Sequence, residues 1–199
     1  MENSTAAPES VAIGPEAIAT SYVALLLKKQ YQATLMMLRE AIEKCPDELW
    51  ARASDTNQSW QLAYHALYFT HLYLQPGLDE FKPWPGQHAP SQNDDGIGGP
   101  PDPKSNLPVI PEPYTKEEVL AFWQYCWDGI ESAIAELDLT SEKSGFPWYP
   151  FSKLEHQLVN LRHAQHHTAQ LAERLRTSCG EGIRWYGTWP RSKRTQQEE

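Results

Sequence analysis

Residues 158–171 read LVNLRHAQHHTAQL and carry three of the chain's seven histidines. His163 and His167 are four positions apart, so in a helix their side chains lie on one face, about one turn from each other. Two imidazoles in this relation can bind one metal ion together. The stretch therefore predicts a long helix that supplies two ligands of a metal site.

A helical wheel of this stretch, drawn at about 100° per residue, separates an apolar arc from a charged side. The apolar arc holds Leu154, Leu158, Leu161, Thr168, Leu171 and Ala172. His163 and His167 fall on the shoulder of this arc, whereas His166 falls beside the charges and is the weakest of the three as an inward ligand. The strip with His163 and His167 also carries His156, Asn160, Gln170 and Arg174. A polar strip at the edge of a core is typical of a pocket wall.

A third ligand would have to come from another helix, and His65 is the candidate. It lies in the middle of an apolar helical stripe formed by Leu62, Phe69 and Leu72. Three neutral imidazoles with open positions would suit zinc, nickel or another borderline divalent ion. Two other interpretations stay open: a histidine on an apolar face is commonly a hydrogen-bonded core residue, and His-x-x-x-His also occurs by chance on exposed helices.

Length and composition indicate one globular domain, because the chain has 199 residues of which 40% are hydrophobic. We expect this domain to span residues 1–190 and the polar residues 191–199 to form a disordered tail. The net charge of -9 argues against nucleic-acid binding.

The three cysteines are far apart and form no Cys-x-x-Cys motif. This favours a reducing cytoplasm over a disulfide framework. The first residues lack the basic start and the apolar stretch of a signal peptide, and the longest aliphatic run is too short to cross a membrane. We therefore expect a cytoplasmic protein with no membrane partner.

Start and stop signals divide the chain into four long helices. Pro15 suits the first position of a helix that ends near residue 44, before Pro46, and a short helical turn can follow at 47–53. Asn57 or Ser59 can cap a second helix that runs to about residue 75.

Capping boxes at Thr115 and Ser152 predict the starts of the third and fourth helices, and Gly180 ends the fourth. With no convincing strand and no internal repeat, the sequence predicts an all-α protein, a four-helix bundle. The aromatic residues beyond the fourth helix are expected to dock on this bundle; they are Trp185, Tyr186 and Trp189.

Residues 75–114, between the second and third helices, hold ten prolines and five glycines. This composition excludes a core helix or a central strand and predicts a long insertion. Its apolar residues include Trp84, Ile97, Leu107, Val109 and Ile110, from which we expect a partial cover over the helices. The proline pairs also allow a second interpretation, a peptide ligand for a partner domain.

Motifs of several other enzyme classes are absent from the sequence. There is no His-Glu-x-x-His of a zinc protease, and no Glu three positions before a His as in di-iron bundles. There is also no P-loop and no Gly-x-Ser-x-Gly.

The two histidine motifs resemble those of the DinB-like superfamily. The first is His65 within WQLAYHAL (residues 60–67), and the second is His-x-x-x-His-x-x-Gln, present as His163, His167 and Gln170. The resemblance implies a four-helix bundle of the DinB type, often dimeric, with a divalent metal held by His65, His163 and His167. It also implies, for some members, a transferase or isomerase activity with a low-molecular-weight thiol. The chain departs from the family in having Thr168-Ala169 where Arg-Gly is common.

Two functions follow from these observations. The first is a metal-dependent enzyme of the thiol-dependent transferase or hydrolase type that acts on a small molecule. The residues that could orient the histidines or bind its substrate are Gln61, Tyr68, Asn160, Gln170 and Arg174. The second is a non-catalytic module, either a metal-stabilised scaffold or a protein-interaction domain that uses the proline-rich insertion or the tryptophan-rich C-terminal segment.

Overall fold

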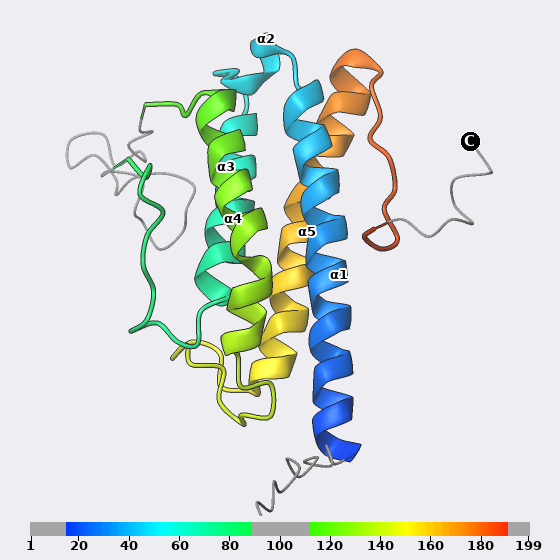
Figure 1. Cartoon of the computed structure of the whole chain (residues 1–199). Helices are drawn as coiled ribbons and strands as arrows, with labels where there is room; N and C mark the ends of the chain where they lie inside the picture. Colours follow the sequence, from blue (N-terminus) through cyan, green and yellow to red (C-terminus); the bar gives the residue numbers. More distant parts are fainter. Residues whose placement is uncertain (1–14, 89–111, 191–199) are drawn as a thin grey trace, which may run out of the picture.

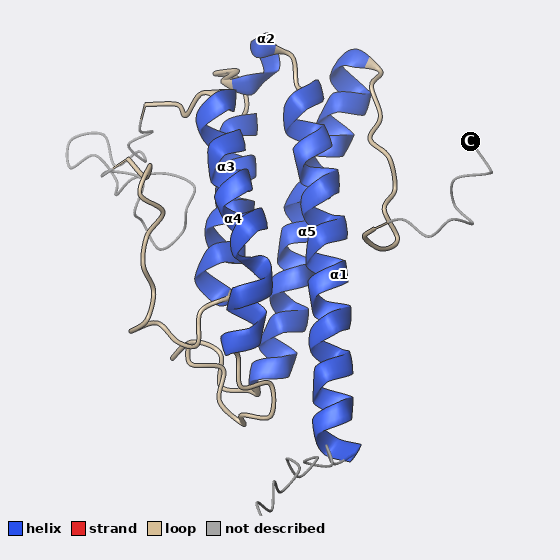
Figure 2. Cartoon of the chain, in the orientation of Figure 1, coloured by secondary structure: helices blue, strands red, loops and turns tan. Residues whose placement is uncertain are grey.

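The computed structural model describes residues 15–88 and 112–190, and this part of the chain is all-α (Figures 1 and 2). Five helices and no strands occur in it, as the sequence predicts. The helices are α1 (Pro15–Lys44), α2 (Asp47–Trp50), α3 (Ser59–Tyr73), α4 (Lys116–Glu136) and α5 (Lys153–Cys179). Residues 191–199, for which we predict a disordered tail, lie outside the described part.

The four long helices pack side by side, and each of them contacts two neighbours (Figure 1). The contacting pairs are α1·α4, α1·α5, α3·α4 and α3·α5. Helices α1 and α5 run in one direction, and α3 and α4 run in the other. Because α3 and α4 are parallel, their connection has to return the chain from one end of the molecule to the other.

Helix α3 lies at the centre of the packing and is buried along almost its whole length. Part of its cover comes from the residues that follow it, since Phe81 and Trp84 pack against the core. Trp84 stacks on Phe122 of α4 with ring centroids 4.8 Å apart. The expected cover is therefore confirmed for Trp84, whereas Ile97, Leu107, Val109 and Ile110 lie outside the described residues.

Most helix ends follow the sequence signals, including the start of α1 at Pro15. The Thr115 hydroxyl accepts a hydrogen bond from the backbone N–H of Glu118, and the Ser152 hydroxyl accepts one from Glu155. Gly180, with φ of 74°, ends α5 in the left-handed conformation that glycine adopts most readily.

The predicted cap of α3 is wrong. The N-cap is Gln58, and its backbone N–H donates to Oε1 of Gln61 at 2.7 Å. Neither Asn57 nor Ser59 is the N-cap residue, and both contact other segments. The Ser59 hydroxyl donates to the carbonyl of Leu49, and the carbonyl of Asn57 accepts from Arg174.

A buried lysine joins three segments at the end of the molecule where α5 begins. The Lys153 side chain is only 3% exposed. Its Nζ donates to the carbonyls of Ser144, Pro76 (2.7 Å) and Gln75 (3.4 Å). The α4–α5 connection and the residues after α3 are therefore tied to the first turn of α5.

The C-terminal segment 181–190 lies along α1. Nζ of Lys44 donates to the carbonyl of Gly182 at 2.6 Å, and Nε2 of Gln30 donates to the carbonyl of Gly187 at 3.0 Å. Trp189 packs edge-on against Trp127 of α4. The docking prediction is wrong for Trp185, however, whose side chain is 74% exposed.

None of the helices in the described ranges is both long enough and apolar enough to cross a membrane.

Candidate metal centre

The buried face of α5 is more polar than the wheel predicts. It consists of Lys153, His156, Gln157, Asn160, Ala164, His167, Thr168, Leu171 and Leu175. Leu158, placed in the apolar arc by periodicity, is 56% exposed. Several of these polar residues are hydrogen-bonded, which allows their burial. The amide of Gln157 accepts from the hydroxyl of Tyr31 at 2.8 Å and donates to the carbonyl of Tyr73 at 2.9 Å.

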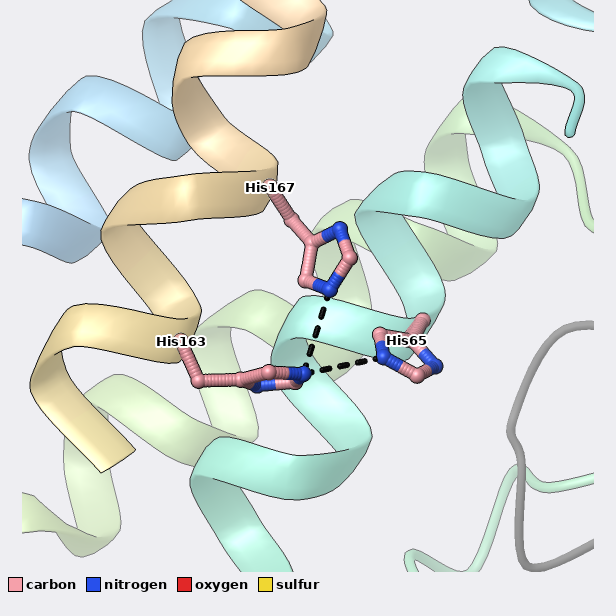
Figure 3. A group of neighbouring side chains, drawn as sticks. All are labelled: His65, His163 and His167. Atoms are coloured by element: carbon pink, nitrogen blue, oxygen red, sulfur yellow. Dashed lines mark hydrogen bonds between the residues drawn. The ribbon is translucent and has the colours of Figure 1, made fainter. Parts of the chain in front are cut away.

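Three histidine side chains converge between α3 and α5 (Figure 3). His65 comes from α3, and His163 and His167 come from successive turns of α5. Nε2 of His163 lies 3.0 Å from Nε2 of His65 and 3.1 Å from Nε2 of His167. His65 and His167 are each 8% exposed, and His163 is partly buried. The structure thus brings together the three residues that the sequence singles out.

The geometry of these nitrogens fits a shared cation better than a hydrogen-bond network. A ring nitrogen carries one proton or one lone pair, so Nε2 of His163 cannot pair well with both neighbours at once. Two nitrogens about 2.0–2.1 Å from one ion and 3.0 Å apart would subtend an angle of about 95° at that ion. This angle is compatible with the coordination of divalent transition metals.

His163 and His167 are held in the neutral form that a metal ligand requires. Burial lowers the pKa of His163 to about 4, with further lowering by His167 and His166. Burial also lowers the pKa of His167. At neutral pH these two imidazoles therefore keep a lone pair for an ion.

A family model described as the DinB superfamily matches residues 30–171 of the chain. The match covers more than half of the sequence and includes His65, His163, His167 and Gln170. The chain belongs to the DinB superfamily. No curated protein and no solved structure gave a significant match to this DinB protein.

Of the other candidate site residues in this DinB protein, Gln170 contacts the histidine cluster. Its Oε1 lies 2.7 Å from Nδ1 of His167. Tyr68 is buried and packs among the rings of Tyr64, Phe69 and Phe81. Gln170 is therefore placed to orient a ligand, and Tyr68 contributes to the packed surroundings.

Gln61, Asn160 and Arg174 form their hydrogen bonds away from the histidine cluster. Gln61 accepts from the backbone at the start of α3. Nδ2 of Asn160 donates to the carbonyl of Thr70 on α3 at 3.3 Å. Arg174 donates to the hydroxyl of Ser59 at 3.0 Å and to the carbonyl of Asn57 at 2.8 Å. The contacts of Asn160 and Arg174 hold α3 and α5 in register, and that register fixes the distance between the histidines.

Phe69 supports the cluster in a way that sequence reasoning missed. Its ring centroid lies 4.7 Å from that of His65 and 5.3 Å from that of His163. It was assigned to the apolar stripe of the second helix, one turn after His65. The four-residue interval places Phe69 beside His65 on α3, but nothing in the sequence indicates that Phe69 also contacts α5.

Two hollows lie on α5 near the histidine cluster, and only the smaller is lined by one of the three histidines. The larger has a volume of about 710 Å³ and is lined by Ser54, Asp55, Thr56, Asn57, Leu62, His166, Ala169, Gln170, Glu173 and Arg174. A smaller hollow of about 300 Å³ reaches His163 from the side of Tyr149 and Arg162. A small polar molecule therefore has room next to Gln170, which contacts His167.

Proposed function

We propose that this chain is a DinB-type four-helix bundle, with a long insertion between α3 and α4, that holds one divalent transition-metal ion and uses it in catalysis. Zinc and nickel are among the ions that imidazole ligands suit, and they are the ones we propose. The observation that carries the proposal is the number of ligands. Within the described residues, the cluster of possible metal ligands contains three side chains, His65, His163 and His167, and no fourth. Catalytic sites keep an open position in this way, whereas structural zinc sites are usually closed by four ligands.

In this proposal the protein orients the metal-binding histidines and provides a partly enclosed site for the substrate. Gln170 holds the ring of His167 through Nδ1, and Phe69 packs against the other two rings. The hollow beside Gln170 receives the substrate. A bound divalent ion would act as a Lewis acid and would lower the pKa of a thiol or water that it binds.

The proposed substrate is a low-molecular-weight thiol, in a transferase or hydrolase reaction. Support comes from the polar lining of the larger hollow, where hydroxyl and amide side chains outnumber apolar ones. A small polar thiol can form hydrogen bonds there while its sulfur faces the histidines.

A non-catalytic scaffold is the second candidate, and one observation favours it. No carboxylate belongs to the histidine cluster within the described residues. The nearest acidic residues of α5, Glu155 and Glu173, have exposed side chains. A reaction that requires a carboxylate as general base would lack one at this site.

Metal content tests the metal centre directly. The full chain, purified without a histidine tag and without chelators, should contain about one zinc or nickel ion per chain by mass spectrometry. His65→Ala, His163→Ala and His167→Ala should each lose most of the metal. His166→Ala is the matched control, since His166 is adjacent on α5 but exposed, and it should keep the ion.

Retention of the metal in all three variants would contradict the proposed site. Loss in the control as well would indicate a site that is not the one described. The open position is tested separately, by titrating small thiols into cobalt-substituted protein and following the near-ultraviolet and visible absorption spectrum. A sulfur-to-cobalt charge-transfer band supports an open position, and an unchanged spectrum favours the scaffold.

A further inference from the structure

The smaller hollow on α5 is lined mainly by side chains that can donate hydrogen bonds. It has a volume of about 300 Å³ and is lined by Tyr149, Val159, Arg162, His163 and His166. Apart from Val159, each of these side chains can carry an N–H or O–H group, and none is a carboxylate. This lining contrasts with the chain as a whole, whose net charge is -9. An anion can therefore bind in this hollow without repulsion from its walls.

Arg162 gives the hollow a positive charge that no carboxylate of the chain neutralises. Its side chain is exposed, and it forms no ion pair within the described residues. Four other arginines do pair with carboxylates, namely Arg39, Arg52, Arg174 and Arg176. A guanidinium presents its N–H groups in a planar fork that matches the oxygens of a carboxylate. Arg162 is therefore available to a carboxylate that comes with a ligand.

His163 brings a second donor to the same hollow. Its Nε2 faces the other two histidines (Figure 3), at 3.0 Å and 3.1 Å from their Nε2 atoms. When Nε2 binds a metal, the proton of the neutral ring is on Nδ1. Nδ1 of His163 is buried and has no hydrogen-bond partner in the described part of the chain. A metal-binding histidine usually donates this N–H to an acceptor, as His167 can to Gln170.

We propose that the smaller hollow binds the carboxylate of a small organic acid, which accepts hydrogen bonds from Arg162 and from Nδ1 of His163. The two oxygens of a carboxylate allow it to accept from both donors at once. His163 lines the hollow, and the rotamer changes that are common on ligand binding bring its buried N–H within reach.

This inference rests on the proposed metal centre and adds the chemical class of a second substrate. A transferase reaction needs an acceptor besides the thiol. In this assignment the thiol occupies the larger hollow beside Gln170, and the organic acid occupies the smaller hollow beside His163.

Propionate and propionamide test the site, because they have nearly the same shape and differ in charge. Each is titrated into the zinc-loaded full chain, and the backbone amide resonances of residues 159–166 report binding by NMR. Propionate should shift these resonances in a saturable way and should bind about tenfold more tightly than propionamide. Equal affinities for the two probes would overturn the proposal, and so would tighter binding of inorganic phosphate than of propionate.

An arginine variant assigns the binding to the hollow. Arg162→Gln should weaken propionate binding about tenfold, because the charged donor is lost. Arg176→Gln is the matched control: it removes an equal charge from the same helix, but Arg176 does not line this hollow. It should bind propionate as the native protein does. If Arg162→Gln keeps the native affinity, propionate binds elsewhere, for example on the ion itself, and the proposal is overturned.

Zinc affinity tests the contact with His163. An acceptor for its Nδ1–H makes the imidazole a stronger ligand, so saturating propionate should raise the zinc affinity about tenfold. Competition with a chromophoric chelator measures this rise, which Arg162→Gln should lose at the same propionate concentration. An unchanged zinc affinity of the native protein would refute the contact.

The same probes distinguish failure of this inference from failure of the metal centre. If the native chain takes up no zinc, the metal centre is wrong, and propionate is then titrated into the metal-free chain. A saturable shift of the 159–166 resonances that is lost in Arg162→Gln still supports a carboxylate site in the hollow. Unchanged resonances refute it.

Discussion

Nδ1 of His167 and Oε1 of Gln170 lie 2.7 Å apart across one turn of α5. The amide oxygen accepts, so the proton of the neutral imidazole is on Nδ1 and the lone pair is on Nε2. That lone pair faces the Nε2 atom of His163, 3.1 Å away. Gln170 therefore fixes both the tautomer and the ring orientation that a metal ligand needs.

Gln170→Leu should weaken metal binding about 10- to 100-fold, because the ring of His167 loses the partner that orients it. Competition with a chromophoric chelator measures the affinity. Gln170→Glu should restore it, since a carboxylate also accepts from Nδ1. Gln165→Leu, on the same helix, is the control and should bind metal normally. Equal affinities for the native protein and Gln170→Leu would rule out this positioning role.

His156 should make the fold sensitive to acid. Its side chain is fully buried among aromatic rings, including those of Tyr73, Phe146 and Tyr149, and neither of its ring nitrogens has a hydrogen-bond partner. Burial, and secondarily Lys153, lowers the pKa of His156 to about 4.

In the unfolded chain His156 therefore becomes protonated near pH 6.5, whereas in the folded protein it becomes protonated only near pH 4. The contribution of His156 to stability is complete above pH 6.5 and is lost as the pH falls toward 4, by about 3 kcal/mol in total. Urea unfolding at a series of pH values measures this loss. His156→Phe, which keeps an aromatic ring there, should remove that part of the pH dependence; an identical acid limb in the variant would refute the prediction.

Lys153→Met should destabilise the protein by about 2–3 kcal/mol, because it leaves buried carbonyls without their charged donor. Those carbonyls belong to Ser144, Pro76 and Gln75, on two connections that Lys153 joins to α5. The free energy of unfolding in urea measures the effect. Lys143→Met, in the same connection but exposed, should change it by less than about 0.5 kcal/mol. Similar values for both variants would show that the buried contacts are not stabilising.

Alanine substitutions at two glycines should change the stability of the fold in opposite directions. Gly145 has a φ of 86°, and a Cβ there would collide with the carbonyl oxygen of Pro76 and lie 2.8 Å from Cα of Gly77. Gly145→Ala should cost about 3 kcal/mol. Gly129 lies inside α4 with open space around its Cα, so Gly129→Ala should stabilise by about 0.5–1 kcal/mol. Thermal unfolding compares them, and a shift of the same sign in both would contradict the argument.

Periodicity and spacing predicted the features that depend on neighbours within one helix. The pair His163 and His167 needed only a four-residue interval, and the caps at Thr115 and Ser152 needed only the residues three positions later. The third histidine was found because His65 interrupts an otherwise apolar stripe. The resemblance to the DinB-like superfamily rests on the same histidines, and the family match over residues 30–171 confirms it.

The sequence predictions fail where residues from distant segments determine whether a side chain is buried. Gln157 is fully buried because Tyr31 and Tyr73, 126 and 84 positions away, satisfy its amide. Leu158 is exposed because the helix turns toward these polar partners. The position of Trp185 depends likewise on Lys44 and Gln30 of α1. A helical wheel considers only the residues of one helix and therefore carries no information about hydrogen-bond partners in distant segments.

The separation of the histidines along the chain limits when the site can form. His65 and His163 are 98 positions apart, and α5 is the last helix of the fold. During translation, α1 to α4 are complete before His163 and His167 have been added. Until then the chain presents one of the three imidazoles, and the complete cluster forms only when α5 packs against α3.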